Sequence, residues 1–364
     1  MHPRPHIPLW IATLAVALAA LPVHGQAPPG PITPPANPPP QPPTVRVRVE
    51  EVSTPVTVRD RQGELMLHLE QKNFRLLEDG VEQKIEHFDL GTEPLSVVLV
   101  VENGDRVEGL LPAVRKTSIL ISQKLMQGDV ELALVSYDDT VVERQEFTTS
   151  GDAAERAMNR LPGGIQGAVL YDALSRGISL LSRRPKNRRR VILALAEPVD
   201  RGSETKLSEV LRDAQLQNVT IYSVGLSPTA AELRHPPVEP APSPFPPGAV
   251  PGPPGVPQTP STTAAESSSG DLGAVAVWIG RNVRDWVKKN SLELAAEGTG
   301  GRNISAFSDA AVQNGLSQIA DELHAQYTLA YRPSEGHRPG FHRIEVEVDQ
   351  PDLKVRARPG YFLE

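Results

Sequence analysis

The sequence predicts an α/β fold in which a doubly wound, mostly parallel, Rossmann-like sheet carries a flanking β module. Between residues 95 and 226, apolar strand-like runs alternate with segments of helical period. The run 95–101, "LSVVLVV", is continuously apolar, as is typical of a strand covered on both faces. The segments 45–93 and 333–364 alternate with the period of strands, so we expect the two to pack together as one β module.

The amino terminus has the features of an export signal. "MHPRPH" is followed by the uncharged run "IPLWIATLAVALAALPV", and Val23 and Gly25 stand at the two positions that a signal peptidase reads. We expect residues 1–25 to be a signal peptide, cleaved after Gly25, and the chain to be periplasmic or extracellular. The alternative is an uncleaved membrane anchor, although the run is shorter than the roughly 20 residues of a spanning helix.

Proline marks two segments that cannot form a packed core. Of the 37 prolines, ten fall in residues 28–43 and twelve in residues 236–260. Such runs favour extended polyproline II structure. We predict a linker at 26–44 and a disordered insertion at 235–272. A PxxP ligand for a partner domain is the alternative role for the insertion.

Composition and motifs exclude several function classes. The net charge of -7 argues against a dedicated nucleic-acid binder, and the absence of cysteine excludes disulfides, thiolate metal sites and a cysteine nucleophile. No nucleophile elbow or phosphate-binding glycine loop is present. The basic run "SRRPKNRRR", residues 182–190, is expected to be a solvated turn after a helix, rather than a nucleic-acid site.

Within the amino-terminal β segment, turn residues separate the predicted strands. "VRVRV" at 45–49 alternates strictly, and "TPVTVRDRQGELM" at 54–66 predicts two strands about a turn at Gly63. Asp79-Gly80 between two alternating runs predicts a tight hairpin, because a primed turn needs positive φ.

The central region predicts a regular order of strands and helices, followed by strands at the carboxyl end. Helices are expected at 107–125, 152–160, 171–183, 204–217, 276–290, 292–301 and 312–324, and strands at 95–101, 130–137, 189–197, 219–226, 327–333, 341–349 and 353–360.

Several stretches together resemble the von Willebrand factor type A domain, specifically the bacterial group described as acidobacterial VWFA-related proteins. They include "PLSVVLVVENGDRV", "GAVLYDALSRGISLL", "RRRVILALAEPVD", "AAEGTGGRNISAF" and "IADELHAQYTLAYRP". The resemblance covers nearly all of the chain from residue 45 onward, apart from the proline-rich insertion. It implies a type A domain at 94–332, between the β segments 45–93 and 333–364.

The resemblance implies where a metal site would lie, but this sequence lacks several of the ligands that such a site uses. Type A domains typically bind Mg²⁺ through Asp-x-Ser-x-Ser after the first strand, a later Thr and a later Asp. Mg²⁺ prefers about six oxygen ligands. Glutamate stands here at both aspartate positions of the motif, and none of the three hydroxyl positions carries a hydroxyl. We therefore expect no cofactor and no Mg²⁺ at these degenerate positions, which are Glu102, Gly104, Arg106, Ala168 and Glu197.

Arg106 suggests what replaces the metal. A guanidinium matches carboxylates in geometry, so Arg106 is expected to pair with Glu102, Glu197 or Asp105 and to make the domain metal-independent. The alternative is that Arg106 points into solvent and the site has decayed.

These features predict a protein-interaction module, for adhesion or as a scaffold, rather than an enzyme. Its partner is an unidentified protein, and it touches a membrane only through an uncleaved signal. The alternative is an envelope hydrolase that uses Glu102 and Glu197 as an acid/base pair. The expected partner-binding residues are Glu102, Asn103, Asp105, Arg106, Ala168 and Glu197.

Overall fold

The structure is a computed structural model that describes residues 51–226, 290–333 and 340–363. In these residues, no helix has the length and apolar content needed to cross a membrane. Several predictions lie outside the described residues: the signal peptide 1–25, the linker 26–44, the alternating run 45–49, the insertion 235–272 and nearly all of the helix expected at 276–290.

A six-stranded sheet of order β10-β9-β8-β5-β6-β7 confirms the predicted fold class. All its neighbouring pairs are parallel except β6 and β7, which pair antiparallel. Adjacent parallel strands bring their carboxyl ends to one edge of the sheet, called here the carboxyl edge; the opposite one is the amino edge. The strands are β5 (Leu95–Glu102), β6 (Val130–Tyr137), β7 (Val141–Thr148), β8 (Arg189–Ala196), β9 (Val219–Leu226) and β10 (Asn303–Ala306).

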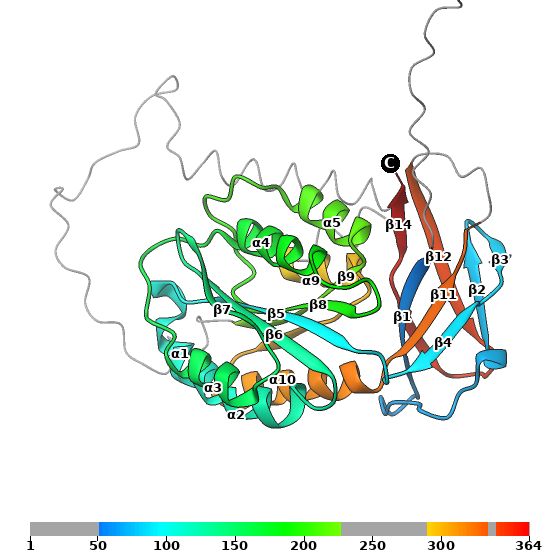
Figure 1. Cartoon of the computed structure of the whole chain (residues 1–364), viewed down its shortest axis with the longest axis horizontal. Coiled ribbons are helices and arrows are strands. Elements are labelled where there is room, and N and C mark those ends of the chain that lie inside the picture. Colours follow the sequence, from blue (N-terminus) through cyan, green and yellow to red (C-terminus); the bar gives the residue numbers. More distant parts are fainter. Residues whose placement is uncertain (1–50, 227–289, 334–339, 364) are drawn as a thin grey trace, which may run out of the picture. The chain divides into compact units, whose positions relative to one another are not determined.

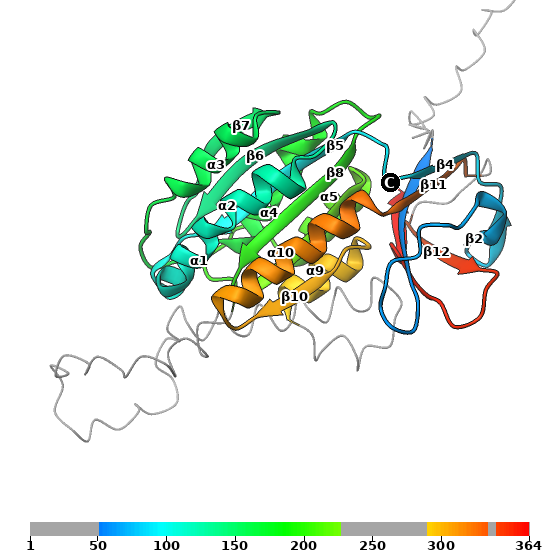
Figure 2. The same cartoon turned by 90° about the horizontal axis from the view of Figure 1, so that it is seen from below.

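Helices cover both faces of this sheet (Figures 1 and 2). One face packs against α4 (Leu170–Ser182), α5 (Leu207–Leu216) and α9 (Ser291–Gly298). The other packs against a second set: η2 (Asp105–Leu110), α1 (Leu111–Lys116), α2 (Ser118–Leu120), η3 (Ile121–Leu125), α3 (Gly151–Asn159) and α10 (Asp309–His324). This is the doubly wound arrangement that the alternation of runs predicts.

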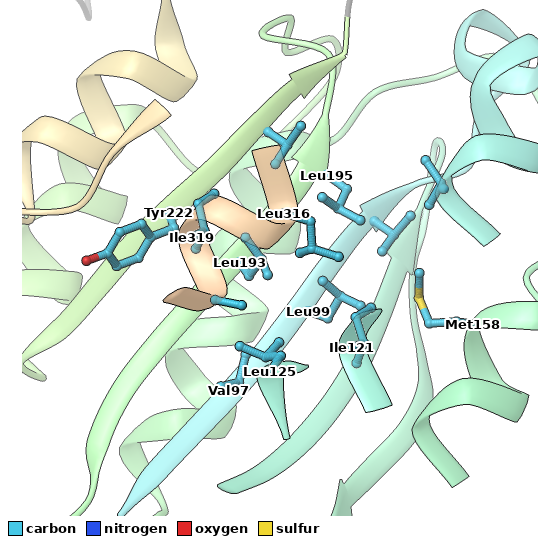
Figure 3. Close-up of a cluster of buried hydrophobic side chains, with 14 of the residues drawn as sticks. Val97, Leu99, Ile121, Leu125, Met158, Leu193, Leu195, Tyr222, Leu316 and Ile319 are labelled. Atoms are coloured by element: carbon cyan, nitrogen blue, oxygen red, sulfur yellow. The ribbon is translucent and has the colours of Figure 1, made fainter. Parts of the chain in front are cut away.

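The strand side chains alternate between two apolar cores. Val98 and Val100 face the core beneath α4 and α5, whereas Leu99 faces the core beneath α10. Figure 3 shows this second core, where Leu99 and Leu193 lie among side chains of the surrounding helices. Each such fully buried leucine contributes about 1.5–3 kcal/mol to folding.

Two antiparallel sheets form the β module, with orders β13-β1-β11-β4 and β14-β12-β2-β3. Both contribute to one core that includes Phe74, Leu76 and Tyr327. The predicted hairpin joins β2 to β3, with φ of 49° at Asp79 and 81° at Gly80. The strands are β1 (Val52–Arg59), β2 (Phe74–Glu78), β3 (Val81–Gln83), β4 (His87–Leu90), β11 (Tyr327–Tyr331), β12 (Gly340–Val348), β13 (Lys354–Ala357) and β14 (Gly360–Leu363), with the short 3-10 helix η1 (Gln71–Asn73) before β2.

Strand pairing differs from the boundary predicted at residue 332 between the α/β domain and the carboxyl-terminal strands. β11 lies between β1 and β4, so it belongs to the β module and not to the α/β domain. The α/β domain therefore runs from Leu95 to His324. Alternation alone gave no indication of which sheet a buried strand at the boundary would join.

Local structure also differs from expectation in several places, among them the unpredicted short strands β10 and β14. The strand predicted after Gly63 is reduced to one bridge between Arg59 and Leu65. The helix expected at 107–125 is divided into η2, α1, α2 and η3, with Pro112 in the first turn of α1. Proline has no N–H to continue a preceding turn. The edge strand β7, "VVERQEFT", was not predicted, because its mixed charges show no apolar alternation.

One buried carboxylate joins the α/β domain to the β module. Glu322 of α10 is fully buried and accepts hydrogen bonds from Tyr222 of β9 at 2.9 Å and from Arg59 of β1 at 3.0 Å. Thr57 of β1 donates at 3.2 Å, and Arg356 of β13 also donates to the same carboxylate. A single side chain thus connects two strands of one module to a strand and a helix of the other.

The basic run 182–190 contains the exposed turn that was predicted, but several of its arginines are paired rather than solvated. Arg184 forms a bidentate pair with Glu131, at 2.7 and 2.5 Å, and Arg188 pairs with Asp129 at 2.8 Å. The run therefore neutralises acidic residues at the amino edge of the sheet. Arg189 and Arg190 donate to backbone carbonyls instead.

Candidate functional site

The residues predicted for the metal position meet at the carboxyl edge of the sheet. Glu102 is the last residue of β5, and Glu197 directly follows β8, which is the parallel neighbour of β5. Ala168 precedes α4 and is fully buried, and its carbonyl accepts a hydrogen bond from Arg201 N at 2.8 Å. The sheet order therefore brings together three segments that are far apart in sequence.

Arg106 and Glu197 form a bidentate ion pair. Arg106 Nε lies 2.6 Å from Glu197 Oε2, and Arg106 NH2 lies 2.7 Å from Glu197 Oε1. Glu197 is buried, whereas the Arg106 side chain is 33% exposed. The hydrogen bonds to Glu197 raise the pKa of Arg106. Paired N–H donors on one carboxylate give a strong and geometrically specific contact.

Glu102 lies beneath this pair and is fully buried. Its Oε2 accepts a hydrogen bond from Glu197 N at 2.6 Å. Burial raises the pKa of Glu102 to about 7; the Glu197 carboxylate also raises it, and the Glu197 N–H and Arg106 oppose the shift. Glu102 Oε1 and the hydroxyl of Tyr137 are both enclosed, and neither has a hydrogen bond of regular geometry in the described part of the chain.

The loops around Arg106 are joined by hydrogen bonds to the backbone. Asn103 O accepts from Gly164 N at 2.7 Å, and Ile165 O accepts from Asp105 N at 3.3 Å. The Asp138 carboxylate accepts from Ile165 N at 3.2 Å. The loop that carries residues 163–165 is therefore fixed to the loops after β5 and β6. We call Asp105, Arg106, Ile165 and Glu197 the Arg106 site.

Burial separates the predicted partner-binding residues into two groups. Asp105 and part of Arg106 are accessible. Asn103 and Ala168 were predicted to contact a partner, but both are buried and present no side chain to one. Glu102 and Glu197 are buried as well. These four residues position the loops rather than form their outer surface.

Two contributors to this edge were not predicted from the sequence. Asp200 Oδ1 accepts hydrogen bonds from Tyr171 N at 3.0 Å and from Ser203 Oγ at 2.6 Å, which ties the loop after β8 to the start of α4. Burial raises the pKa of Asp200. Ile165 is 61% exposed. Asp200 could have been found from its position four residues after the buried strand β8. No feature of the sequence indicated that Ile165 would be exposed.

The residues at this edge do not fit Mg²⁺. Gly104, Arg106 and Ala168 supply no side-chain oxygen, and the guanidinium binds both oxygens of Glu197. A cation at close range would be repelled by Arg106. In the residues that the structure describes, no three histidine, cysteine or acidic side chains are grouped to hold a metal ion.

Comparison with known proteins yields structural similarities at low identity. No family model and no curated protein matches the chain. An aerotolerance-related membrane protein from Bacteroides fragilis matches at 12% identity and TM-score 0.39, over 62% of this chain and 98% of that one. The conserved hypothetical protein BatB from Bacteroides thetaiotaomicron matches at 12% identity and TM-score 0.32.

The SpRpn10 VWA domain matches at 16% identity and TM-score 0.32, over 37% of this chain and 76% of that one. The BatB match covers 36% of this chain and 66% of the BatB chain, which is just under two thirds of its length. These similarities concern the fold, which the sheet order itself establishes as a mostly parallel α/β sheet covered by helices on both faces.

Proposed function

We propose that this chain is an exported VWFA-like protein-interaction module, for adhesion or as a scaffold, that works without a metal ion. The bidentate pair between Arg106 and Glu197 is the observation that carries the proposal. It places a permanent positive charge next to the two carboxylates that remain of the resembled motif. Membership of the type A family and export are parts of the proposal that rest on the sequence.

Preorganisation of the loops supports an interaction role. Hydrogen bonds with Asn103, Asp105 and Asp138 fix the loop that carries Ile165. A loop that is already ordered loses less conformational entropy when a partner binds. Ile165 thus offers an apolar side chain, 61% exposed, on a backbone that is hydrogen-bonded to Asp105, the sequence neighbour of Arg106. Arginine is one of the residue types enriched at interface hot spots.

The raised pKa of Glu102 favours a second candidate, an envelope hydrolase with Glu102 and Glu197 as acid and base. Two observations oppose it. Glu102 is fully buried, so a substrate cannot reach its carboxyl group. Both oxygens of Glu197 are bound by Arg106. We therefore prefer the interaction module.

A binding experiment tests the proposed surface. Ile165→Asp should abolish capture of the partner from an envelope extract of the cells that produce the protein, because it places a charge at the apolar anchor. Val81→Asp, on β3, is the matched control, since Val81 is 63% exposed. Equal capture by both variants and the wild type would contradict the proposed surface.

Thermal unfolding tests metal independence. We expect millimolar Mg²⁺ to leave the Tm of the chelator-treated protein unchanged, because ligand binding to the folded state alone would raise it. A saturable increase in Tm would contradict metal independence. Export is tested separately by mass spectrometry of the mature chain, which should begin at Gln26.

A further inference from the structure

A large cavity lies at the amino edge of the sheet, opposite the Arg106 site. Its volume is about 850 Å³. One wall comes from the sheet of the β module and includes Ser53, Thr328 and Ala330; the other comes from the starts of β8 and β9 and includes Arg190 and Asn218. Ligand sites of proteins are commonly about 300–1,000 Å³ in volume.

Two arginines of this wall bind the same helix end. Arg190 NH1 donates to Gln217 O at 3.0 Å, directly after α5, and NH2 donates to Arg184 O at 2.7 Å, after α4. Arg358 NH2 donates to Gln215 O at 3.2 Å, in the last turn of α5. Both guanidiniums therefore surround the carboxyl end of α5.

The helix ends neutralise only part of these two positive charges. In the described residues, neither Arg190 nor Arg358 forms an ion pair with a carboxylate. The carboxyl end of a helix carries about half a negative charge, so α4 and α5 together offset about one of the two positive charges. Burial lowers the pKa of both arginines, that of Arg358 to about 10. About one positive charge is left over at the wall of the cavity.

Three acids also line the cavity: Glu51, which is exposed to solvent, and Glu93 and Asp89, which have other partners. Glu93 lies 3.0 Å from His87 and 4.0 Å from the guanidinium of Arg189, so it is shared between two side chains. Asp89 accepts a hydrogen bond from Thr92 N at 2.9 Å within its own turn. Neither carboxylate contacts Arg190 or Arg358.

Three groups in the cavity wall lack hydrogen-bond partners in the described part of the chain. They are Arg189 Nε, Arg190 Nε and Thr328 Oγ1. Arg189 and Thr328 are both more than nine-tenths buried. All three groups can donate a hydrogen bond, and a buried donor without an acceptor costs about 1–3 kcal/mol. These donors are enclosed behind the cavity surface, so an acceptor-rich, negatively charged ligand would pair with them after a small movement of the side chains that cover them.

We propose that this cavity binds a small organic anion through its carboxylate or phosphate group, with Arg190 and Thr328 as recognition residues and Arg358 as the buried counter-charge. The oxygens of the anion accept hydrogen bonds from the guanidinium and the hydroxyl. The volume of the cavity exceeds that of a single phosphate ion, which leaves room for a polar organic body.

Titrations of the full chain with inorganic phosphate and with citrate test this site, with Tm as the readout and chloride keeping the ionic strength constant. At least one of the two anions should raise the Tm saturably, and the better one identifies the group that is recognised. If neither anion does so, the proposal is overturned.

Variants locate the binding. Arg190→Gln should weaken anion binding by at least a factor of about ten, which corresponds to about 1.4 kcal/mol. Thr328→Val should weaken it as well, and it leaves the contacts of the arginines to the helix ends intact. Arg212→Gln, on the exposed side of α5, is the control and should bind like the wild type. Wild-type affinity for the anion in both Arg190→Gln and Thr328→Val would overturn the assignment of these residues to the anion site. Neither result depends on the Arg106 site.

Discussion

At the scale of single residues, the Arg106–Glu197 pair is a contact whose loss should be measurable. Glu197 is buried, so removal of the guanidinium leaves its carboxylate without its main partner. We expect Arg106→Gln to lower the free energy of unfolding by about 1.5–3 kcal/mol. Urea denaturation of the single variants Arg106→Gln and Glu197→Gln and of the double variant measures the coupling. Additive losses would show that the pair does not contribute to stability.

The buried carboxyl of Glu102 predicts a pH dependence. Its pKa is about 7 in the folded chain, compared with 4.5 for a glutamate that is not perturbed by its surroundings. Between these values the unfolded state releases the proton first, so stability falls as pH rises from 4.5 through 7. The pKa difference corresponds to about 3 kcal/mol. The unfolding free energy of the wild type should decrease relative to that of Glu102→Gln between pH 5 and pH 8. A constant difference between the two proteins would contradict this prediction.

At the scale of elements, the loop 161–169 depends on a glycine with no space for a side chain. A Cβ on Gly164 would lie 2.6 Å from Asp138 Oδ2 and 2.8 Å from Asn103 O, so Asn103 or the loop would have to move. We expect Gly164→Ala to cost about 1–3 kcal/mol. At Gly163 the nearest atom would be Glu108 Oε1 at 3.8 Å, so Gly163→Ala should be tolerated. Thermal unfolding of the two variants provides the comparison, and equal Tm values would contradict it.

The predictability of each element follows from its burial. β5 and β8 were predictable because strands covered on both faces are continuously apolar. Glu102 and Glu197 could be placed together because neighbouring parallel strands end at the same edge. β7 escaped prediction because an edge strand keeps polar residues on both faces. Ile165 escaped as well, since its exposure depends on the conformation of a loop.

At the scale of the whole molecule, Glu322 is a buried polar link between the α/β domain and the β module. It accepts hydrogen bonds from Arg59 and Tyr222, and Arg356 also donates to it. Glu322→Gln removes the only negative charge of this link, so we expect a loss of about 3–5 kcal/mol. Hydrogen exchange should show early loss of protection in β1 and β13.

A matched control for this prediction is an exposed ion pair in the β module. Asp352 pairs with Arg61, and both side chains are more than half exposed. Exposed pairs contribute about 0–1 kcal/mol, so Asp352→Asn should leave stability nearly unchanged. If Glu322→Gln were no more destabilising than Asp352→Asn, the link would not stabilise the contact between the two modules.

The pairing of β1 with β11 and β13 has a consequence for the order of folding during synthesis. β1 is among the first described segments to leave the ribosome, whereas its partners are made roughly 280 residues later; at about 5–20 residues per second, this leaves β1 unpaired for roughly 15–55 s. The α/β domain, by contrast, is complete once α10 has been made. Nascent chains of this protein are therefore expected to carry a finished α/β domain together with amino-terminal strands, β1 and β4, that still lack their partner β11.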